Sequence, residues 1–419
     1  VEGSGDRLRR AAVRGHDLQL NLDLALQQRI HEVFPGSLHG AVVVLDVPTG
    51  EVLALYSHPS FDPGTQSDAV GGATGAAALP PERALASLHA PGPTFDLVTA
   101  AIALSLGVLE PGARMPIPCR GGLPYGERYF RCWDRKGHGA LDLAQAIGVS
   151  CDVYFYQVGL KLGLERLLRE GARLGFTAAT GVDLPGERPG SFPVEDGPDW
   201  RGSAEGGDPV AGAAASGEAG EPGGAGRSGA VGASGGADRE GGRDAAMLLE
   251  LATGGRNAQT PLGMARFYVA LAGDGRAPVP RVVAGRPAPG AGADVELRLT
   301  GSQLEALREG LRRVTAPGGA GRRAALERGE VIGQTGMARQ ADGTEHAWFV
   351  GIAGPRGGNG EIVVAVVLEA GGTVAEAARI VAEVADYSLQ NRHGVPADTM
   401  KALTQRQLAQ NSARPVPWD

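Results

Sequence analysis

Three cysteines and one histidine are the residues of this chain best suited to bind a metal ion. Cys119, Cys132 and Cys151 are the only cysteines among the 419 residues, and His138 lies between the last two of them. Three thiolates and one imidazole make a complete tetrahedral ligand set for Zn²⁺, although their spacing is not that of a zinc finger. We therefore expect a structural zinc site at these four residues.

A disulfide is the main alternative for the same cysteines. Cys119 and Cys132 could pair in an oxidising compartment, and Cys151 would then be a buried free thiol. The odd number of cysteines favours zinc, because a disulfide leaves one thiol over. Zinc, a disulfide and inert thiols all remain open from the sequence.

The composition predicts a large globular domain that contains one segment unable to pack. The chain has 67 glycines and only 5% aromatic residues. Between residues 202 and 243 Gly, Ala, Ser and acidic residues dominate and no aromatic residue occurs, so this segment is predicted to be a disordered insertion. The net charge of -7, with no basic cluster and interleaved aromatic residues apparent, argues against nucleic-acid binding.

Hydrophobic patterns predict a sheet that has helices from both ends of the chain on one face. Residues 23–34 have the apolar spacing of a helix, and residues 41–45 and 52–56 are short apolar runs typical of paired strands. Near the other end, residues 361–369 form a β-branched run, and residues 374–389 again have helical spacing. This pattern indicates an α+β layer architecture.

Several segments together resemble the transpeptidase domain of class B penicillin-binding proteins, the elongation-type enzymes that cross-link peptidoglycan. The resemblance is carried, in the order of the family, by residues 40–62, 139–156, 180–187, 260–268 and 346–351. It implies an α+β fold like that of penicillin-binding proteins and serine β-lactamases, with an antiparallel sheet flanked by helices and a helical subdomain. It also implies three parts of the chain: a remnant of an N-terminal pedestal or linker (1–15), a transpeptidase-like domain (16–389) and a C-terminal tail (390–419).

The active-site motifs of that family are altered in this chain. The family uses a Ser-x-x-Lys, a Ser-x-Asn or Ser-x-Asp, and a Lys-Thr-Gly on an edge strand. The matching residues here are Pro93 and Asp96 for the first motif, Ser150 and Asp152 for the second, and Gln334, Thr335 and Gly336 for the third. By this resemblance the second motif is retained, whereas the nucleophile and both lysines are replaced.

These replacements predict a protein that no longer catalyses acyl transfer. A serine nucleophile needs a neighbouring base, and Pro93 and Asp96 supply neither group. We expect these two residues to favour the start of a helix instead, through the fixed φ of proline and the attraction of a carboxylate to the helix dipole.

The resemblance then implies a pseudoenzyme that acts as a binding or scaffold component in peptidoglycan synthesis and cell-shape maintenance. The expected partners are the peptidoglycan stem peptide or cell-wall synthesis proteins, with weak or absent β-lactam binding. The alternative is an active D,D-transpeptidase or carboxypeptidase whose nucleophile is Thr94 or Ser150. An altered gene product without function is the third possibility.

The resemblance also bears on the metal and on the compartment. Some elongation-type members hold zinc near the active site with Asp, His and Cys ligands, and His138 and Cys151 match two of these positions, while Cys119 and Cys132 replace the acidic ligands. The family implies the cell envelope, at the periplasmic face of the inner membrane. No run of 18 or more apolar residues occurs in the chain, so we expect membrane attachment only through an N-terminal anchor missing from it.

Overall fold

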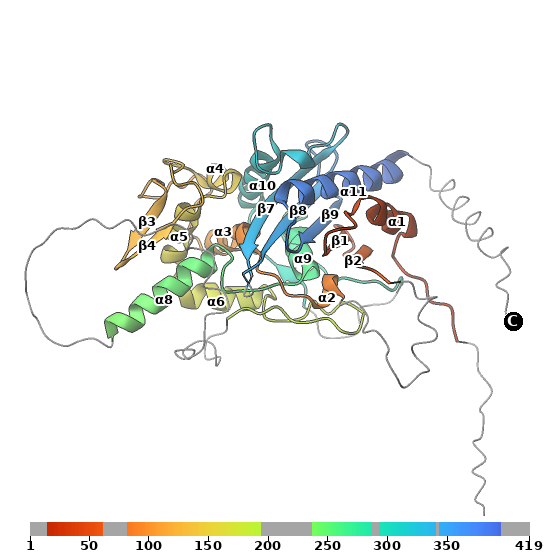
Figure 1. Cartoon of the computed structure of the whole chain (residues 1–419), viewed down its shortest axis with the longest axis horizontal. Coiled ribbons are helices and arrows are strands. Elements are labelled where there is room, and N and C mark those ends of the chain that lie inside the picture. Colours follow the sequence, from red (N-terminus) through yellow and green to blue (C-terminus); the bar gives the residue numbers. More distant parts are fainter. Residues whose placement is uncertain (1–14, 62–81, 194–236, 286–292, 341–342, 395–419) are drawn as a thin grey trace, which may run out of the picture.

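A five-stranded antiparallel sheet is the centre of the fold (Figure 1). The computed structural model describes residues 15–61, 82–193, 237–285, 293–340 and 343–394. The strand order is β2-β1-β9-β8-β7, which leaves β7 at one edge of the sheet. The strands are β1 (Gly40–Asp46), β2 (Val52–His58), β7 (Glu330–Arg339), β8 (Glu345–Gly354) and β9 (Ile362–Leu368).

Helices α1 (Leu24–Val33) and α11 (Val374–Gly394) cover one face of this sheet. Alternate residues of β1 face opposite sides, so that Val42 and Val44 pack against these two helices while Val43 packs on the other side. The Arg29 side chain ties α1 to α11 through an ion pair with Glu383 of 2.8 Å. The predicted placement of the terminal helices on one face is confirmed.

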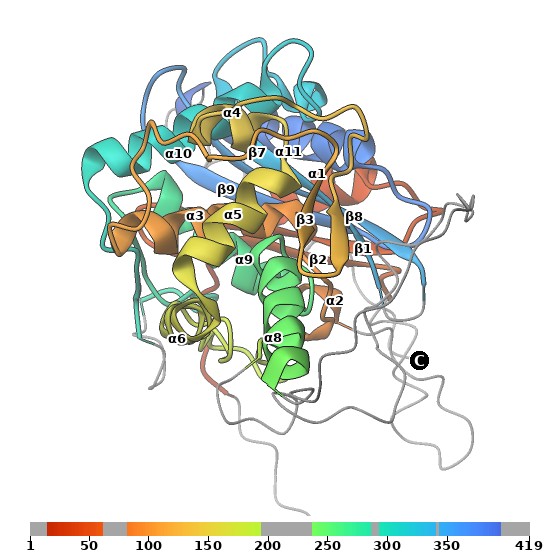
Figure 2. The ribbon, with the colours of Figure 1, turned by 90° about the vertical axis from the view of Figure 1, so that its left-hand side faces the viewer.

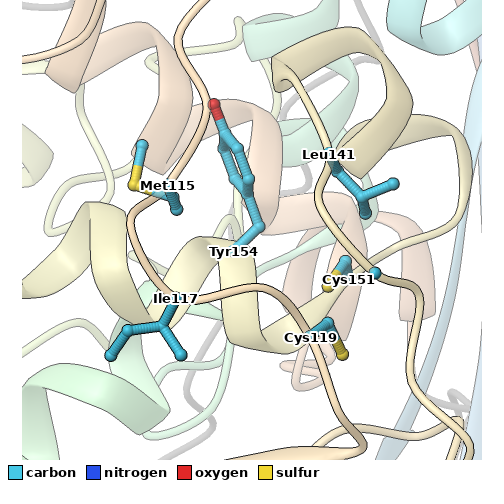
Figure 3. A pocket seen from close by; sticks show the side chains of 7 residues that line it. Met115, Ile117, Cys119, Leu141, Cys151 and Tyr154 are labelled. Atoms are coloured by element: carbon cyan, nitrogen blue, oxygen red, sulfur yellow. The ribbon is translucent and has the colours of Figure 1, made fainter.

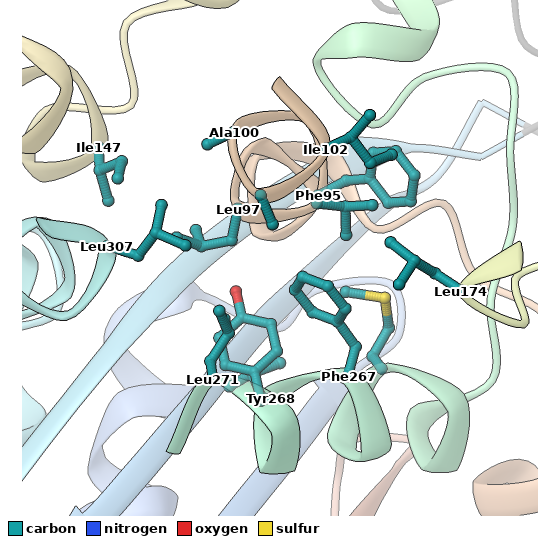
Figure 4. Close-up of a cluster of buried hydrophobic side chains, with 14 of the residues drawn as sticks. Phe95, Leu97, Ala100, Ile102, Ile147, Leu174, Phe267, Tyr268, Leu271 and Leu307 are labelled. Atoms are coloured by element: carbon teal, nitrogen blue, oxygen red, sulfur yellow. The ribbon is translucent and has the colours of Figure 1, made fainter. Parts of the chain in front are cut away.

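A larger core lies on the opposite face of the sheet (Figure 4). Helix α9 (Pro261–Ala272) is buried along its whole length, because its sequence is apolar on every side. Its Phe267 and Tyr268 point toward α3 (Asp96–Ser105), and Leu307 of α10 (Gly301–Thr315) closes the same cluster. The Tyr268 hydroxyl donates to the carbonyl of Thr94 at 3.0 Å, which fixes the segment just before α3.

A helical subdomain and a short hairpin stand beside the sheet at one end of the molecule (Figure 2). The helices are α4 (Leu143–Gly148), α5 (Asp152–Leu162), α6 (Leu164–Arg173) and α8 (Ala237–Ala252), and the hairpin pairs β3 (Gly122–Tyr125) with β4 (Arg128–Arg131). The remaining elements are α2 (Arg83–Ala86), η2 (Gly92–Phe95), β5 (Arg276–Ala277), β6 (Val295–Glu296) and η3 (Arg322–Ala324). No helix in the described part of the chain has both the length and the apolar character needed to cross a membrane.

Two element boundaries differ from the sequence-based expectation. Helix α8 begins at Ala237, inside the segment 202–243 that was predicted to be a disordered insertion. The sequence did not reveal this start because the glycines at 241 and 242 interrupt the helical pattern. Helix α11 continues to Gly394, past the expected end at residue 389. The expected pedestal remnant, most of the insertion and most of the tail lie outside the described residues, so those assignments stay predictions.

Candidate functional site

The three motif segments come together where η2 and α3 meet the edge strand β7. The Ser150 hydroxyl donates to the Gln334 Oε1 at 3.4 Å. Strand β7 and η2 approach so closely that a Cβ atom on Gly336 would lie 2.6 Å from the Pro91 carbonyl oxygen. Only glycine fits at this position, so the close approach fixes the distance between the two motif segments.

The amide of Gln334 is used inside the protein. The side chain is fully buried, its Nε2 donates to the Ile147 carbonyl at 3.2 Å, and its Oε1 also accepts from the Thr335 backbone N–H at 3.0 Å. Thr335 and Gly336 are buried as well, whereas Met337, the next residue of β7, is 42% exposed. Gln334 therefore joins β7 to the end of α4. We call the junction of Ser150, η2 and β7 the cleft.

Residues of η2 differ sharply in exposure. Pro93 is partly exposed at the position of the family's nucleophile. Thr94 is fully buried, and its hydroxyl donates to the Pro91 carbonyl at 2.8 Å. The only residue of η2 that reaches the surface thus has no hydroxyl, and the neighbouring hydroxyl is engaged.

Asp96 is a buried carboxylate at the first position of α3. It is 2% exposed, and its Oδ1 has no hydrogen-bond partner among the described residues. Burial, followed by the negative charges of Asp152 and Cys132, raises the pKa of Asp96 well above its usual value. Pro93 lies in the first turn of η2 and Asp96 in the first turn of α3, as expected for residues that favour a helix start, although the desolvation of the buried carboxylate opposes its attraction to the helix dipole of about 0.3–1 kcal/mol.

One turn places three successive side chains in three different directions. Ser150 has a φ of 47°, in the left-handed region, at the junction between α4 and α5. Its hydroxyl points to Gln334, whereas the Asp152 Oδ2 accepts the Trp133 backbone N–H at 2.9 Å. Cys151 lies between them and points to the cysteine cluster. Ser150 therefore contacts β7, whereas Asp152 holds the backbone of Trp133, a partner that the sequence did not reveal.

Cys119, Cys132, His138 and Cys151 form one compact cluster, as their types suggested. Their four potential ligand atoms all lie within 4.8 Å of one another. The His138 Nδ1 is 3.7 Å from the Cys119 sulfur and 3.5 Å from the Cys132 sulfur. Bond lengths of about 2.3 Å for Zn–S and about 2.0 Å for Zn–N at a tetrahedral angle give a separation of about 3.6 Å. The donor set and its spacing both fit Zn²⁺.

The loop that carries His138 depends on a close backbone contact. Gly137 has a φ of 83°, and a Cβ atom there would lie 2.4 Å from the Cys119 carbonyl oxygen. Cys119 and Gly139 exchange two backbone hydrogen bonds of 2.8 and 2.9 Å. Glycine at position 137 therefore lets the histidine loop lie directly against the segment of Cys119.

All three cysteines are free thiols in the structure. A hydrogen bond from the Cys151 thiol, together with His138, lowers the pKa of Cys132 and favours its thiolate. The same contact raises the pKa of Cys151. Cys119 and Cys151 also line a small pocket together with Met115, Ile117 and Tyr154 (Figure 3).

A histidine pair holds the segment before η2 against the sheet. The Nδ1 atoms of His89 and His346 are 3.0 Å apart, and the Trp348 indole N–H donates to the Ala90 carbonyl at 3.0 Å. Burial, followed by the charges of His346 and Arg83, lowers the pKa of His89 to about 3. His89 is therefore neutral at pH 7, as one hydrogen bond between two imidazole rings requires.

Comparison with known proteins identifies similar sequences. The sequence model of the penicillin binding protein transpeptidase domain matches residues 40–387. The peptidoglycan D,D-transpeptidase MrdA of Haemophilus influenzae is 28% identical over 94% of this chain and 60% of that relative. The MrdA of Escherichia coli K12 is 37% identical over 43% of this chain and 30% of that relative. The chain thus spans less than two thirds of the length of these relatives.

Solved structures of the same kind confirm the expected fold class. Pseudomonas aeruginosa PBP2 in complex with WCK 5153 superposes with a TM-score of 0.71 at 27% identity, over 92% of this chain and 82% of that one. Helicobacter pylori PBP2, solved in complex with MreC, has a TM-score of 0.66 at 22% identity, over 88% of this chain and 63% of that one. The arrangement of an antiparallel sheet flanked by helices is shared with both.

We predict that Asp96→Asn stabilises the protein at pH 7. The substitution keeps the shape of the side chain and removes a carboxyl group whose pKa is raised by burial and whose Oδ1 lacks a partner among the described residues, so unfolding should cost about 1–3 kcal/mol more. Urea denaturation followed by circular dichroism measures the change. Asp183→Asn is the matched control: that carboxylate accepts the backbone N–H groups of Val282 and Val283 at 2.6 and 2.8 Å, so its loss should destabilise. An Asp96→Asn protein that is less stable than wild type contradicts the account.

We also predict that His89 makes the protein sensitive to mild acid. The unfolded chain binds a proton at His89 below about pH 6.5, whereas the folded protein binds one only near pH 3, so stability falls as the pH drops through this window. At about 1.4 kcal/mol per pH unit, this group alone removes about 2 kcal/mol between pH 6.5 and pH 5. Urea denaturation at both pH values should show a smaller loss for His89→Gln than for wild type, and equal losses would refute the assignment.

Proposed function

We propose that this chain, which belongs to the penicillin binding protein transpeptidase domain family, serves peptidoglycan synthesis as a catalytically silent binding or scaffold protein. The proposal rests on Pro93, the one residue of η2 that is partly exposed. Pro93 occupies the nucleophile position without a hydroxyl, and Asp96 supplies a buried carboxylate where the family has a lysine. Covalent catalysis requires a nucleophile with an adjacent base, and neither group is present there.

The two other hydroxyl groups near this position also support a silent site. The Thr94 hydroxyl is fully buried and is bonded to the Pro91 carbonyl. The Ser150 hydroxyl donates to the Gln334 amide oxygen, and an amide is not a general base at neutral pH. Neither hydroxyl therefore meets the requirement for an activated nucleophile.

The edge strand β7 supports retained binding of a peptide. Edge strands bind extended peptides through backbone hydrogen bonds, and such binding needs no nucleophile. We therefore propose the peptidoglycan stem peptide as the ligand of this strand. The family resemblance further suggests the cell envelope as the compartment. The Helicobacter pylori neighbour is in complex with MreC, which supports a cell-wall synthesis protein as a second class of partner. Because the chemical groups for acylation are absent, we expect β-lactam binding to be weak or absent.

We further propose one structural zinc ion held by Cys119, Cys132, His138 and Cys151. The donor set and the sulfur–nitrogen separations support it, as does the thiolate character of Cys132. When bound, the zinc would crosslink four points of the chain and would have no open ligand position for catalysis. These four residues would then connect the β3–β4 hairpin to the start of α5.

The first prediction of this proposal concerns acylation. Intact-mass analysis after incubation with a fluorescent penicillin should show no adduct on the native chain, because no activated hydroxyl is available. The triple variant Pro93→Ser/Asp96→Lys/Gln334→Lys should gain one adduct. Its control carries Pro93→Ala with the same two lysine substitutions and should gain none. An adduct on the native chain would instead establish a working enzyme with another nucleophile.

The second prediction concerns the metal. Elemental analysis of purified protein should find about one zinc per chain. Cys132→Ser should lose most of this zinc and unfold several degrees lower, because one of the four ligand bonds disappears. Thiol titration after chelation should find three reactive cysteines. A metal-free protein in which two thiols are blocked would establish the disulfide instead.

A further inference from the structure

From Tyr129 in β4 to Trp133 just after it, side chains alternate between the solvent and the interior. Phe130 and Cys132 are buried, whereas Tyr129 and Trp133 are 55% and 63% exposed and Arg131 between them is exposed. This period of two places three large side chains on one outer face. We call Tyr129, Arg131 and Trp133 the outward stripe.

The outward stripe is held firmly from behind. The Phe130 ring packs edge-on against Tyr156 with the centroids 5.8 Å apart, and the Tyr156 hydroxyl donates to the Arg131 carbonyl at 3.1 Å. On the outer face, the Tyr129 ring covers Gly122, where a Cβ atom would lie 2.4 Å from the ring. The large exposed side chains therefore sit on an ordered backbone with buried supports.

The surface around the outward stripe is basic although the chain as a whole has a net charge of -7. Between residues 113 and 139 there are six basic residues against two acidic ones. The six are Arg114, Arg120, Arg128, Arg131, Arg135 and Lys136, and all are exposed. None of them forms an ion pair with another described residue. The sequence-based conclusion that no basic cluster with interleaved aromatic residues exists is therefore wrong.

The outward stripe ends at Trp133, which contacts the residue before Ser150. The Trp133 indole N–H donates to the Val149 carbonyl at 2.9 Å, and its backbone N–H donates to Asp152 at 2.9 Å. Val149 is itself 38% exposed and precedes Ser150. From Tyr129 to Trp133 the stripe is about 14 Å long, at about 3.4 Å per residue, which matches four or five residues of an extended peptide. Figure 2 shows the hairpin beside α5, whose first residue is Asp152.

We propose that the outward stripe binds the acidic part of a stem peptide as it leaves the cleft. The inference rests on the proposed function and adds the place and the chemistry of recognition. Stem peptides carry free carboxylates, and an unpaired arginine guanidinium such as that of Arg131 binds a carboxylate through two parallel hydrogen bonds. Tyr, Trp and Arg are also the side chains that contribute most to binding energy at protein surfaces. The ligand class is a carboxylate-bearing peptide attached to a glycan strand.

The test is co-sedimentation of the purified chain with insoluble peptidoglycan sacculi. Arg131→Glu should bind at least tenfold more weakly than wild type, because it removes an attraction to carboxylates and adds a repulsion. Arg131→Lys should fall between the two, since it keeps the charge and loses the paired hydrogen bonds. Arg323→Glu, which changes an exposed arginine on η3, is the matched control and should bind as wild type does. Circular dichroism checks that every variant is folded, and binding should weaken as salt is added.

Additional binding experiments distinguish an error in the role of the outward stripe from an error in the proposed binding function. Sacculi from which an amidase has removed the stem peptides should no longer bind the wild-type chain. Equal binding of this peptide-free glycan, equal binding of Arg131→Glu, or tighter binding of a single-stranded oligonucleotide would each overturn the role of the outward stripe. Absence of wild-type binding to intact sacculi would overturn the proposed binding function itself.

Discussion

The turn at Ser150, Cys151 and Asp152 is the constraint on which the arrangement of the site depends. Its left-handed residue costs about 1–2 kcal/mol of backbone strain, and in return three neighbouring side chains reach three separate structures. Ser150 contacts the edge strand, Cys151 joins the thiol cluster, and Asp152 holds the backbone of Trp133. A shift of this turn would therefore move the cleft, the cluster and the hairpin together.

The electrostatics of the site differ from what the family resemblance implies, because one acid and one neutral amide replace two cations. By the family resemblance, Asp96 and Gln334 stand where two lysines are used. The interior now contains Asp96 and Asp152 near the thiolate-prone Cys132, and no described lysine or arginine hydrogen-bonds to any of these three groups. Burial, followed by the nearby negative charges, raises the pKa of both carboxyl groups, so the site stores unfavourable energy without a nucleophile that uses it. Such a balance is compatible with folding only because the two cores around it are large and well packed.

The sequence predicted the features that depend on residue type or on long patterns. The central strands are continuous apolar runs, and the metal cluster uses every cysteine of the chain, so both could be inferred without coordinates. The environment of Asp96 could not, because α3 packs against α5, which comes from a distant part of the sequence. The outward stripe was missed for a different reason: its alternation spans only five residues, and the net charge of the whole chain conceals a local excess of arginine.

The proposals together imply a change in where a ligand carboxylate is recognised. A lysine in the cleft must sit at a fixed distance from the reacting bond, because acyl transfer depends on exact positioning. A protein that only binds has no such requirement, so arginines on the rim can supply the attraction over a longer stretch of peptide. The buried side of β4 would then hold zinc while its exposed side binds the ligand. Under these proposals Cys132, which lies between Arg131 and Trp133 just after β4, would couple metal binding to peptide binding.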